Sequence, residues 1–371
     1  MTTTSIADQP SATSPISTYP VIVGVDTHQQ THHGAVCDHN GVLLGHCQFE
    51  ATRAGYAMLW VWACAFSTAG VGAAGIESTG SYGAGLTQYL LTVSTGWADG
   101  CDIREVCRPD KTVRARRGKS DAIDAETAAR AVLSGTATAI PKIRTGVIES
   151  IRVLMRVRDL AVRQHTACVL QLRDLITCAP EPLRSKLLPL TATGRVRVAK
   201  ALRPDLDRLT EPAQATKYAL VHTAGHIDDI AARIDKLTAE LEAMVTSTAP
   251  HLLALPQVGT MTAAQILISA GENIDRLTHE AAFARAVGTA PIPASSGKTN
   301  RVRLSRGGDR QANKTIHLLV VRRLGTDPDT ITYMQRRQTE PRMTKRTIIR
   351  ILKRYATRQL YNAAKADLLA A

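Results

Sequence analysis

The sequence has few aromatic residues, no closely spaced cysteine pair and no long apolar run. Phe, Trp and Tyr make up 4% of the residues, so we expect few of the surfaces on which single-strand-binding proteins stack bases. The seven cysteines form no C-x-x-C pair, which argues against a zinc site or a redox disulfide, and we expect reduced thiols. No window offers the roughly 18 apolar residues of a membrane span, and the first residues lack the features of a signal peptide. We therefore expect a cytoplasmic protein.

Acidic residues are outnumbered by basic ones. Lys and Arg total 46 against 32 Asp and Glu, which gives a formal net charge of +14 and a pI near 9.7. Such a surplus favours a polyanionic partner, and nucleic acid is the first candidate. At 371 residues, the chain is long enough for two or three domains with cores of their own.

The first part of the chain has the pattern of a mixed sheet. After a Ser- and Thr-rich leader, residues 1–19, which we expect to be disordered, three strand-like segments follow one another and predict an antiparallel meander. A helix and a strand–helix–strand unit come next, and Ser120 has the features of the N-cap of a further helix. The expected elements of residues 20–145 are strands at Val21–Asp26, Thr31–Asp38, Gly41–Phe49, a segment ending at Glu77 and Ile103–Val106, and helices at Ala54–Phe66 and Leu86–Leu91.

The rest of the chain has helical spacing. In residues 146–250, apolar positions from Ile227 to Met244 alternate steps of three and four, which predicts a coiled coil within the chain or with another subunit. Residues 251–371 contain an apolar helix after LPQVG, a loop at Thr289–Gly308 and two final helices at Gln311–Leu324 and Thr344–Ala366. The last helix and its approach carry a basic face made of Arg342, Lys345, Arg346, Arg350, Lys353, Arg354 and Arg358.

Four carboxylates occupy element ends in the first part of the chain. Asp26 and Glu77 end strands, while Asp121 and Asp124 lie three apart on one helix face. If all four converge, their repulsion requires a cation, and one or two Mg²⁺ ions are the simplest solution. Two such ions about 4 Å apart stabilise the entering and leaving oxygens of phosphoryl transfer. Taken singly, each acid also fits a turn, a helix-dipole partner or a solvated face. The opening strand also suits an actin-like sugar or acyl kinase, which needs later glycine-rich strands to hold nucleotide phosphates.

A serine-containing basic loop follows in the last part. The segment APIPASSGKTNRVRLSRGGDR places Ser295 and Ser296 before Gly297. A serine hydroxyl is a weak nucleophile, and a cationic surrounding would stabilise charge that develops on a phosphate it attacks. Taken alone, the loop favours a Ser-Gly turn in an ordinary DNA-binding loop. Its basic residues are Lys298, Arg301, Arg303, Arg306 and Arg310.

Six segments, in this order, carry a resemblance to a known family. VIVGVDTH, GIESTGSYG, KSDAIDA, LPQVGTMTA, APIPASSGK and SRGGDR resemble the Piv/MooV-type transposases of the insertion-sequence-110 family, the bridge-RNA-guided DNA recombinases. The resemblance runs from about Val21 to Ala366. It implies an α/β plus all-α fold, with an N-terminal ribonuclease-H-like (RuvC-like) domain, a helical coiled-coil insertion and a mainly helical C-terminal transposase domain. The family's DEDD tetrad maps to Asp26, Glu77, Asp121 and Asp124, and its serine to Ser296.

The resemblance also implies a chemistry and partners. Ser296 would attack a DNA phosphate to form a covalent phosphoserine, assisted by the tetrad with Mg²⁺. The partners would be donor and target DNA, a noncoding guide RNA and further copies of the chain in a dimer or tetramer, at the bacterial nucleoid. Ser295 adjoins Ser296, so either hydroxyl could attack. Besides the basic residues of the serine loop and of the last helix, the candidates for phosphate contacts are Arg114, Arg116, Arg117 and Lys119.

Two other functions fit the same residues. A metal-dependent RuvC-like junction nuclease would use the acids without a covalent intermediate, and a nucleic-acid-binding scaffold would use only the charge. Three histidines, His28, His32 and His33, also look like metal ligands. Alternating strand positions prevent them from facing one ion, and only His28 lies near enough to Asp26 to touch the site.

Overall fold

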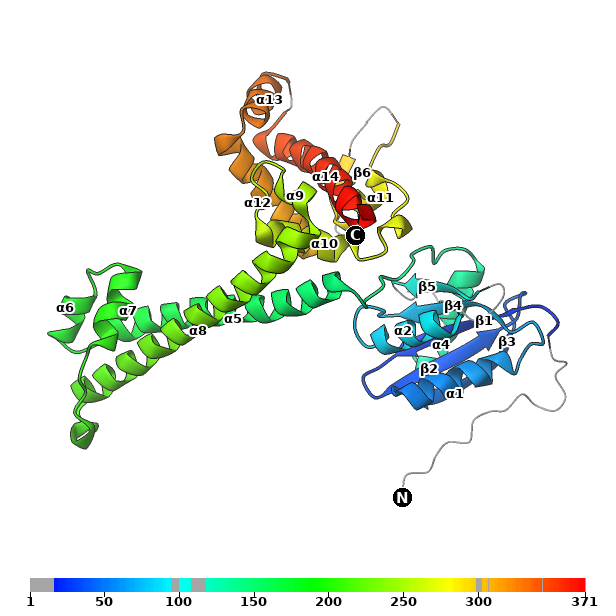
Figure 1. Ribbon diagram of the computed structural model, residues 1–371, viewed down its shortest axis with the longest axis horizontal. Helices are drawn as coiled ribbons and strands as arrows, with labels where there is room; N and C mark the ends of the chain where they lie inside the picture. The colour runs from blue at the N-terminus through cyan, green and yellow to red at the C-terminus, as the bar shows by residue number, and fades with distance from the viewer. Residues whose placement is uncertain are drawn as a thin grey trace. The chain divides into compact units, whose positions relative to one another are not determined.

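The computed structural model describes residues 17–94, 100–107, 118–297, 302–305, 307–341 and 343–370. The chain divides into two compact units, Met1–Arg144 and Thr145–Ala371 (Figure 1). Residues 1–16 of the expected leader lie outside the described residues, whereas the backbone N–H of Ser17 donates to the carbonyl of Phe66. The finer division into four parts stays a prediction. Among the described helices, none combines the length and apolarity that crossing a membrane requires.

The amino-terminal unit is built on a mixed five-stranded sheet. Its described elements are β1 (Val21–Thr27), β2 (Thr31–Cys37), β3 (Leu43–Glu50), α1 (Arg53–Cys64), β4 (Val71–Glu77), α2 (Ala84–Ser94), β5 (Asp102–Val106) and α4 (Asp121–Leu133). The strand order is β3-β2-β1-β4-β5. The first three strands are antiparallel, and β4 and β5 run parallel to β1. The predicted meander followed by β-α-β units is therefore confirmed, and the arrangement is consistent with a ribonuclease-H-like fold.

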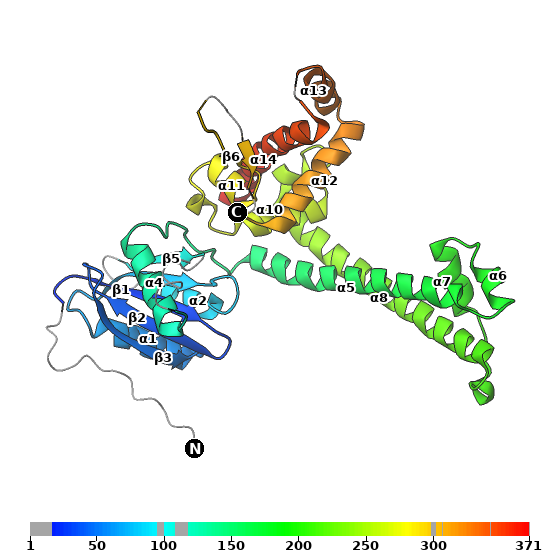
Figure 2. The ribbon, with the colours of Figure 1, turned by 180° about the vertical axis from the view of Figure 1, so that it is seen from behind.

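The two faces of this sheet are covered by different helices. Val21, Val23 and Val25 of β1 pack into one core with α1 and α2. Ile22, on the opposite face of the same strand, packs with Ala129 of α4. Views from opposite sides, Figure 1 and Figure 2, show α1 and α2 on one face and α4 on the other. Since side chains alternate along a strand, residue 26 lies on the face that α4 covers.

Two glycines allow α4 to lie directly on the sheet. A Cβ atom at Gly24 would come within 2.1 Å of the Ala125 carbonyl oxygen and 2.2 Å of the Ala129 nitrogen. A Cβ atom at Gly75 would lie 2.6 Å from the Ala128 carbonyl oxygen. Because no real side chain fits at these distances, the backbone of α4 rests on the backbones of β1 and β4. The contact fixes where the first turn of α4 meets the ends of these strands.

The carboxy-terminal unit is mostly helical. Its described elements are α5 (Val147–Thr177), α6 (Leu183–Leu187), α7 (Ala192–Lys200), η1 (Leu206–Arg208), α8 (Pro212–Thr248), α9 (Pro250–Leu253), α10 (Thr260–Ala270), η2 (Ile274–Arg276), α11 (Glu280–Ala286), β6 (Pro291–Pro293), β7 (Val302–Leu304), α12 (Arg310–Thr326), α13 (Pro328–Gln338) and α14 (Lys345–Ala370). The helical character predicted for residues 146–250 is confirmed in α5 and α8, as are the two final helices. The expected loop at Thr289–Gly308 instead contains a short antiparallel ribbon, β6–β7, and α13 is absent from the sequence prediction.

The long helices α5 and α8 lie side by side and antiparallel (Figures 1 and 2). Leu172, near the end of α5, shares a core with Leu220, near the start of α8. Ile151, near the start of α5, shares a second core with Leu241, near the end of α8. The apolar positions of α8 are thus used at least partly within one chain, and a coiled coil with another subunit stays a prediction.

Candidate metal centre and serine hairpin

Asp26 and Glu77 lie at the ends of neighbouring parallel strands. Val25 of β1 pairs with Ile76 of β4, so the two acids come next to each other in register. The Thr27 hydroxyl donates to the Glu77 carbonyl oxygen at 3.1 Å, which joins the two strand ends. Strand alternation places both acids on the face of the sheet that α4 covers. The sequence prediction of where these two residues lie in the fold is confirmed.

The other two acids come from the first turn of α4. Ser120 has an extended backbone, and its hydroxyl accepts a hydrogen bond from the Ile123 N–H at 3.3 Å, so the helix begins at Asp121 as predicted. Asp121 is exposed, whereas Asp124 is 2% exposed. Asp124 also acts on the charge of Asp26, as its effect on the Asp26 pKa shows. The helix therefore brings negative charge to the strand ends.

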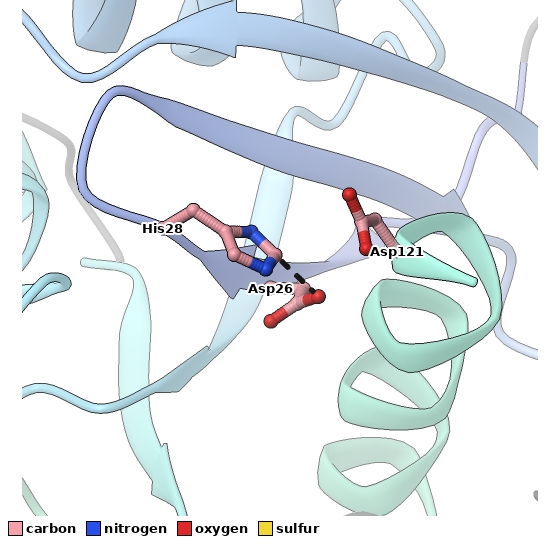
Figure 3. A group of neighbouring side chains, drawn as sticks. All are labelled: Asp26, His28 and Asp121. Carbon is pink, nitrogen blue, oxygen red and sulfur yellow. Dashed lines mark ion pairs between the residues drawn. The ribbon is translucent and has the colours of Figure 1, made fainter. Parts of the chain in front are cut away.

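Three side chains meet closely enough to share one ion. One ligand atom each from Asp26, His28 and Asp121 lies within 4.8 Å of the others. The His28 Nδ1 atom is 4.0 Å from Asp26 Oδ2. Figure 3 shows Asp26 on β1, His28 just beyond the strand and Asp121 at the start of α4, with the three side chains close together. Opposite ligands of an octahedral Mg²⁺ ion are about 4.2 Å apart, so small side-chain movements would suffice to bind a cation.

The electrostatics of Asp26 favour a cation at this place. Asp26 is only 8% exposed. Burial raises the pKa of the Asp26 carboxyl above its usual value, and the charges of Asp124 and Asp121 raise it further, while His28 and Lys119 act in the opposite direction. A bound cation would offset both the desolvation and the repulsion. Carboxylate oxygens are hard ligands, so these residues fit a divalent metal ion.

Glu77 and Asp124 are correctly placed in the fold but do not belong to the closest group. Among the described residues, the group that could hold an ion consists of Asp26, His28 and Asp121. His28 was not among the ligands predicted from the sequence, although its position two residues after Asp26 already placed it near enough to touch the site.

The neighbouring histidines have other partners. The His32 ring stacks on the ring of Tyr56, with 5.5 Å between the centroids. The His33 Nε2 atom lies 3.1 Å from His46 Nδ1. The prediction that His28, His32 and His33 would not face one ion is therefore confirmed.

The two candidate nucleophiles lie on a short hairpin in the other unit. β6 and β7 pair through Ile292 and Arg303, and Ser295 and Ser296 are exposed beyond β6. We call residues 288–308 the serine hairpin. Of the phosphate-contacting residues predicted outside the last helix, Lys119, Arg303 and Arg310 are described and exposed. The others of this set, and one residue of the approach to the last helix, lie outside the described residues: Arg114, Arg116, Arg117, Lys298, Arg301, Arg306 and Arg342.

The base of the serine hairpin is held firmly. Gly288 and Gly308 have positive φ angles of 68° and 84°, and a Cβ atom at Gly308 would lie 2.7 Å from the Gly288 nitrogen. The Asn313 side-chain amide donates to the carbonyl oxygens of Val287 and Gly288 at 3.0 and 2.8 Å. Asp309 caps α12 and accepts hydrogen bonds from Ser269 and Gln265 of α10. Gly308 of the SRGGDR segment thus packs directly against Gly288 at the start of the hairpin. Asp309 of the same segment anchors α12 to α10.

Comparison with known proteins finds a match in each unit. Residues 23–179, which include all four acids, match a family described as "Transposase" and named for the DEDD transposases of IS110. Residues 249–335, which include the serine hairpin, match the "Transposase IS116/IS110/IS902 family". The chain is also 26% identical over 185 residues to the "Insertion element IS110 uncharacterized 43.6 kDa protein" of Streptomyces coelicolor, a match that covers 44% of this chain and 45% of that protein. The chain therefore contains two regions that match transposase domains of the IS110 family.

Proposed function

We propose that the chain is a DNA transposase that cuts and rejoins strands through a covalent phosphoserine at Ser296. The observation that carries the proposal is the meeting of Asp26 and Asp121 at the strand ends, within residues that match a DEDD transposase domain. The exposed serine, in the second matched domain, supplies a nucleophile. An excess of positive charge, +14 overall, suits a DNA substrate.

The four acids have distinct tasks in this proposal. Asp26 and Asp121 would hold Mg²⁺ with His28 beside them, since their ligand atoms already lie within 4.8 Å. Glu77, at the next strand end, and Asp124, one turn into α4, would complete the surroundings of the ion. When bound, Mg²⁺ would polarise a phosphate oxygen and offset the charge that develops during strand transfer. The backbone contact of α4 with the sheet keeps the acids in place before DNA arrives.

The serine would exchange one phosphodiester for another. A bond forms between Ser296 Oγ and phosphorus while the bond between phosphorus and the bridging sugar oxygen breaks. The serine loses its hydroxyl proton, and the departing sugar oxygen takes up a proton. A sugar hydroxyl of a second strand then reverses these steps and releases the serine. Because the number of phosphodiester bonds is unchanged, strand exchange needs no external energy source. Arg303, exposed on β7, would supply positive charge to stabilise the phosphate.

The proposed partners follow from the same mechanism. Donor and target DNA would be the substrates, and a noncoding RNA that pairs with both would choose the sequence, because base pairing can supply specificity while the protein recognises backbone and shape. Two or four copies of the chain would assemble. The serine hairpin and the acidic centre that act on one DNA phosphate would come from the same copy or from neighbouring copies.

Trapping the covalent intermediate tests the proposal. The purified chain is incubated with Mg²⁺, guide RNA transcribed from the DNA that flanks its gene, and labelled donor DNA, and is then denatured. We expect a protein–DNA adduct that survives denaturation with the wild-type chain and with Ser295→Ala, and no adduct with Ser296→Ala. A junction nuclease would recombine DNA with Ser296→Ala and give no adduct with any variant. A scaffold would bind DNA and cut nothing, and either result would reject the phosphoserine mechanism.

Recombination without the RNA tests the proposed guide. Donor and target plasmids are mixed with the wild-type chain with and without the flanking transcript. We expect junctions only when the transcript is present, and changes in its unpaired loops should redirect the target. Equal recombination without the transcript would remove the guide from the proposal while the covalent step stands.

A further inference from the structure

A cationic groove runs between α12 and α14 of the carboxy-terminal unit. One hollow of about 510 Å³ lies beside the base of the serine hairpin, where Ser305 and Gly307 line it. A second hollow, of about 590 Å³, lies beside the first turns of α14. His317 and Lys353 line both hollows, so the two hollows adjoin, and we call them together the groove. Its walls carry Arg310, Lys314 and His317 from α12 and Lys345, Arg346 and Arg350 from α14.

Helical spacing produces the two basic walls. Arg310, Lys314 and His317 follow one another at intervals of four and three residues, so they lie on one face of α12. The basic residues of α14 from Lys345 to Arg350 extend along its first turns. Apart from Lys353, these basic residues are exposed. From Arg310 to His317 the helix rises about 10 Å, which is long enough for consecutive phosphates of one strand and too long for a single phosphate ion.

The chain neutralises one basic face of α14 and leaves the other in place. Glu280, the first residue of α11, forms an ion pair with Arg354 and lies 4.0 Å from Arg358. Of the described residues, no Asp or Glu lines either hollow of the groove. Within the described part of the chain, no carboxylate forms an ion pair with Lys314, Arg346 or Arg350. The basic face predicted for the last helix is therefore split, and the groove holds the part that an outside anion can reach.

The floor of the groove is a buried cation. Lys353 is 7% exposed, and its ammonium donates to the Asn313 side-chain oxygen at 2.5 Å. Burial lowers the pKa of Lys353, since a charged group loses its hydration there. Asn313 in turn donates to the Gly288 carbonyl oxygen at the base of the serine hairpin. An anion in the groove would compensate the desolvated ammonium, and this hydrogen-bond chain connects its position to the hairpin.

We infer that this groove binds the sugar-phosphate backbone of a nucleic-acid strand and guides it to the serine hairpin. The inference rests on the proposed function, because it names the surface that delivers a strand to Ser296. Among the described residues, no Phe, Trp or Tyr lines the groove, so we expect it to bind mainly the backbone, independently of sequence. DNA and RNA share the backbone chemistry that the groove recognises.

A matched pair of double variants tests the groove. Lys314→Gln with Arg350→Gln removes one exposed cation from each wall. Arg322→Gln with Arg358→Gln removes one exposed cation from each of the same two helices, outside the residues that line the groove. Both pairs are made in the full chain carrying Ser296→Ala, and binding is measured in EDTA so that no strand is cut. The probes are fluorescent duplexes of random-sequence DNA and of RNA, titrated over a range of salt concentrations.

We expect the groove variant to bind about tenfold more weakly than the control variant. The slope of log affinity against log salt should fall by roughly 1.5 to 2, because each lost phosphate contact with a duplex removes about 0.9. A selective loss with the DNA probe, the RNA probe or both supports the groove and identifies its strand. Equal losses in the two double variants, or a groove variant with an unchanged slope and an unchanged melting temperature, would overturn the inference. The wild-type adduct assay is independent of this result, so a missing adduct would reject the phosphoserine and leave the groove standing.

Discussion

The two units of the chain concentrate opposite charges by different physical means. In the amino-terminal unit, Asp26 and Asp121 are brought together by backbone packing of α4 on the sheet, and the Asp26 carboxyl is almost buried. In the carboxy-terminal unit, basic residues such as Lys314 and Arg350 are exposed along two helices. Metal binding at a buried acidic centre depends on every group around the ion. Binding of a nucleic acid by a row of exposed cations receives a roughly equal contribution from each of them. Single changes should therefore be severe in the first unit and gradual in the second.

The largest effect is expected at the acidic centre. Asp26→Asn keeps the shape of the side chain and removes a charge that the ion requires, so strand cleavage should fall about a thousandfold. Mn²⁺ binding by calorimetry should weaken in parallel, while the melting temperature stays the same or rises, because repulsion from Asp124 and Asp121 is relieved. Asp102→Asn, an exposed acid of the same unit that pairs with Arg104, serves as the control. Wild-type cleavage by Asp26→Asn would show that the acids are not the metal centre.

A methyl group at Gly24 should have the next largest effect. Gly24→Ala forces α4 away from β1, because its Cβ would lie 2.1 Å from the Ala125 carbonyl oxygen. We expect a loss of about 1–3 kcal/mol in the free energy of unfolding and a drop in cleavage through displacement of Asp121. Gly225→Ala in α8 is the matched control, since nothing lies within 4 Å of its Cβ position. That change should stabilise the helix by about 0.5–1 kcal/mol. Denaturant melts and cleavage assays of both variants compare the two units directly.

The smallest effect is expected at the ion pair between Glu280 of α11 and Arg354 of α14. A hydrogen bond from Arg354 lowers the pKa of Glu280, so the folded state binds this proton less readily than the unfolded chain. The ion pair therefore contributes stability at pH values above 4.5, the usual pKa of a glutamate. That stability is lost as the pH falls from 4.5 through the lowered pKa of Glu280. Glu280→Gln should cost about 0.5 kcal/mol near neutral pH and flatten this part of the acid limb in pH-dependent melts. A variant whose acid limb matches the wild-type curve would mean that the pair contributes nothing.

Much of the amino-terminal unit could be predicted from the sequence. Strand alternation, the Asn40-Gly41 turn and the capping residue Ser120 are local signals, and the parallel order of β1 and β4 then brings Asp26 and Glu77 to one edge. The role of Gly24 was not predictable, because one sequence does not reveal which helix approaches which strand. The sequence also placed His28 near Asp26, and the structure has the two side chains 4.0 Å apart.

The carboxy-terminal unit was harder to predict because its signals are weak or misleading. Pro291 and Pro293 flank Ile292 and gave the first strand of the ribbon the appearance of a loop. Helix α13 follows an Asp-Pro start, yet its 11 residues are mostly polar, so it does not stand out in the sequence. The sequence marked Lys353 and Arg350 alike as basic, and only packing separates the buried ammonium from the exposed guanidinium. Periodicity identifies a helix, but it does not tell which of its charges the fold will cover.

The contact of α4 with Gly24 and Gly75 has a further consequence for protein engineering. A core of interlocking side chains can be rebuilt in many combinations of equal volume, but two main chains in contact offer no such choice. The α1 and α2 side of the sheet could therefore be redesigned extensively without altering the spacing between Asp26 and Asp121. On the α4 side, the distance between helix and sheet is set by the van der Waals radii of the backbone atoms that are in contact.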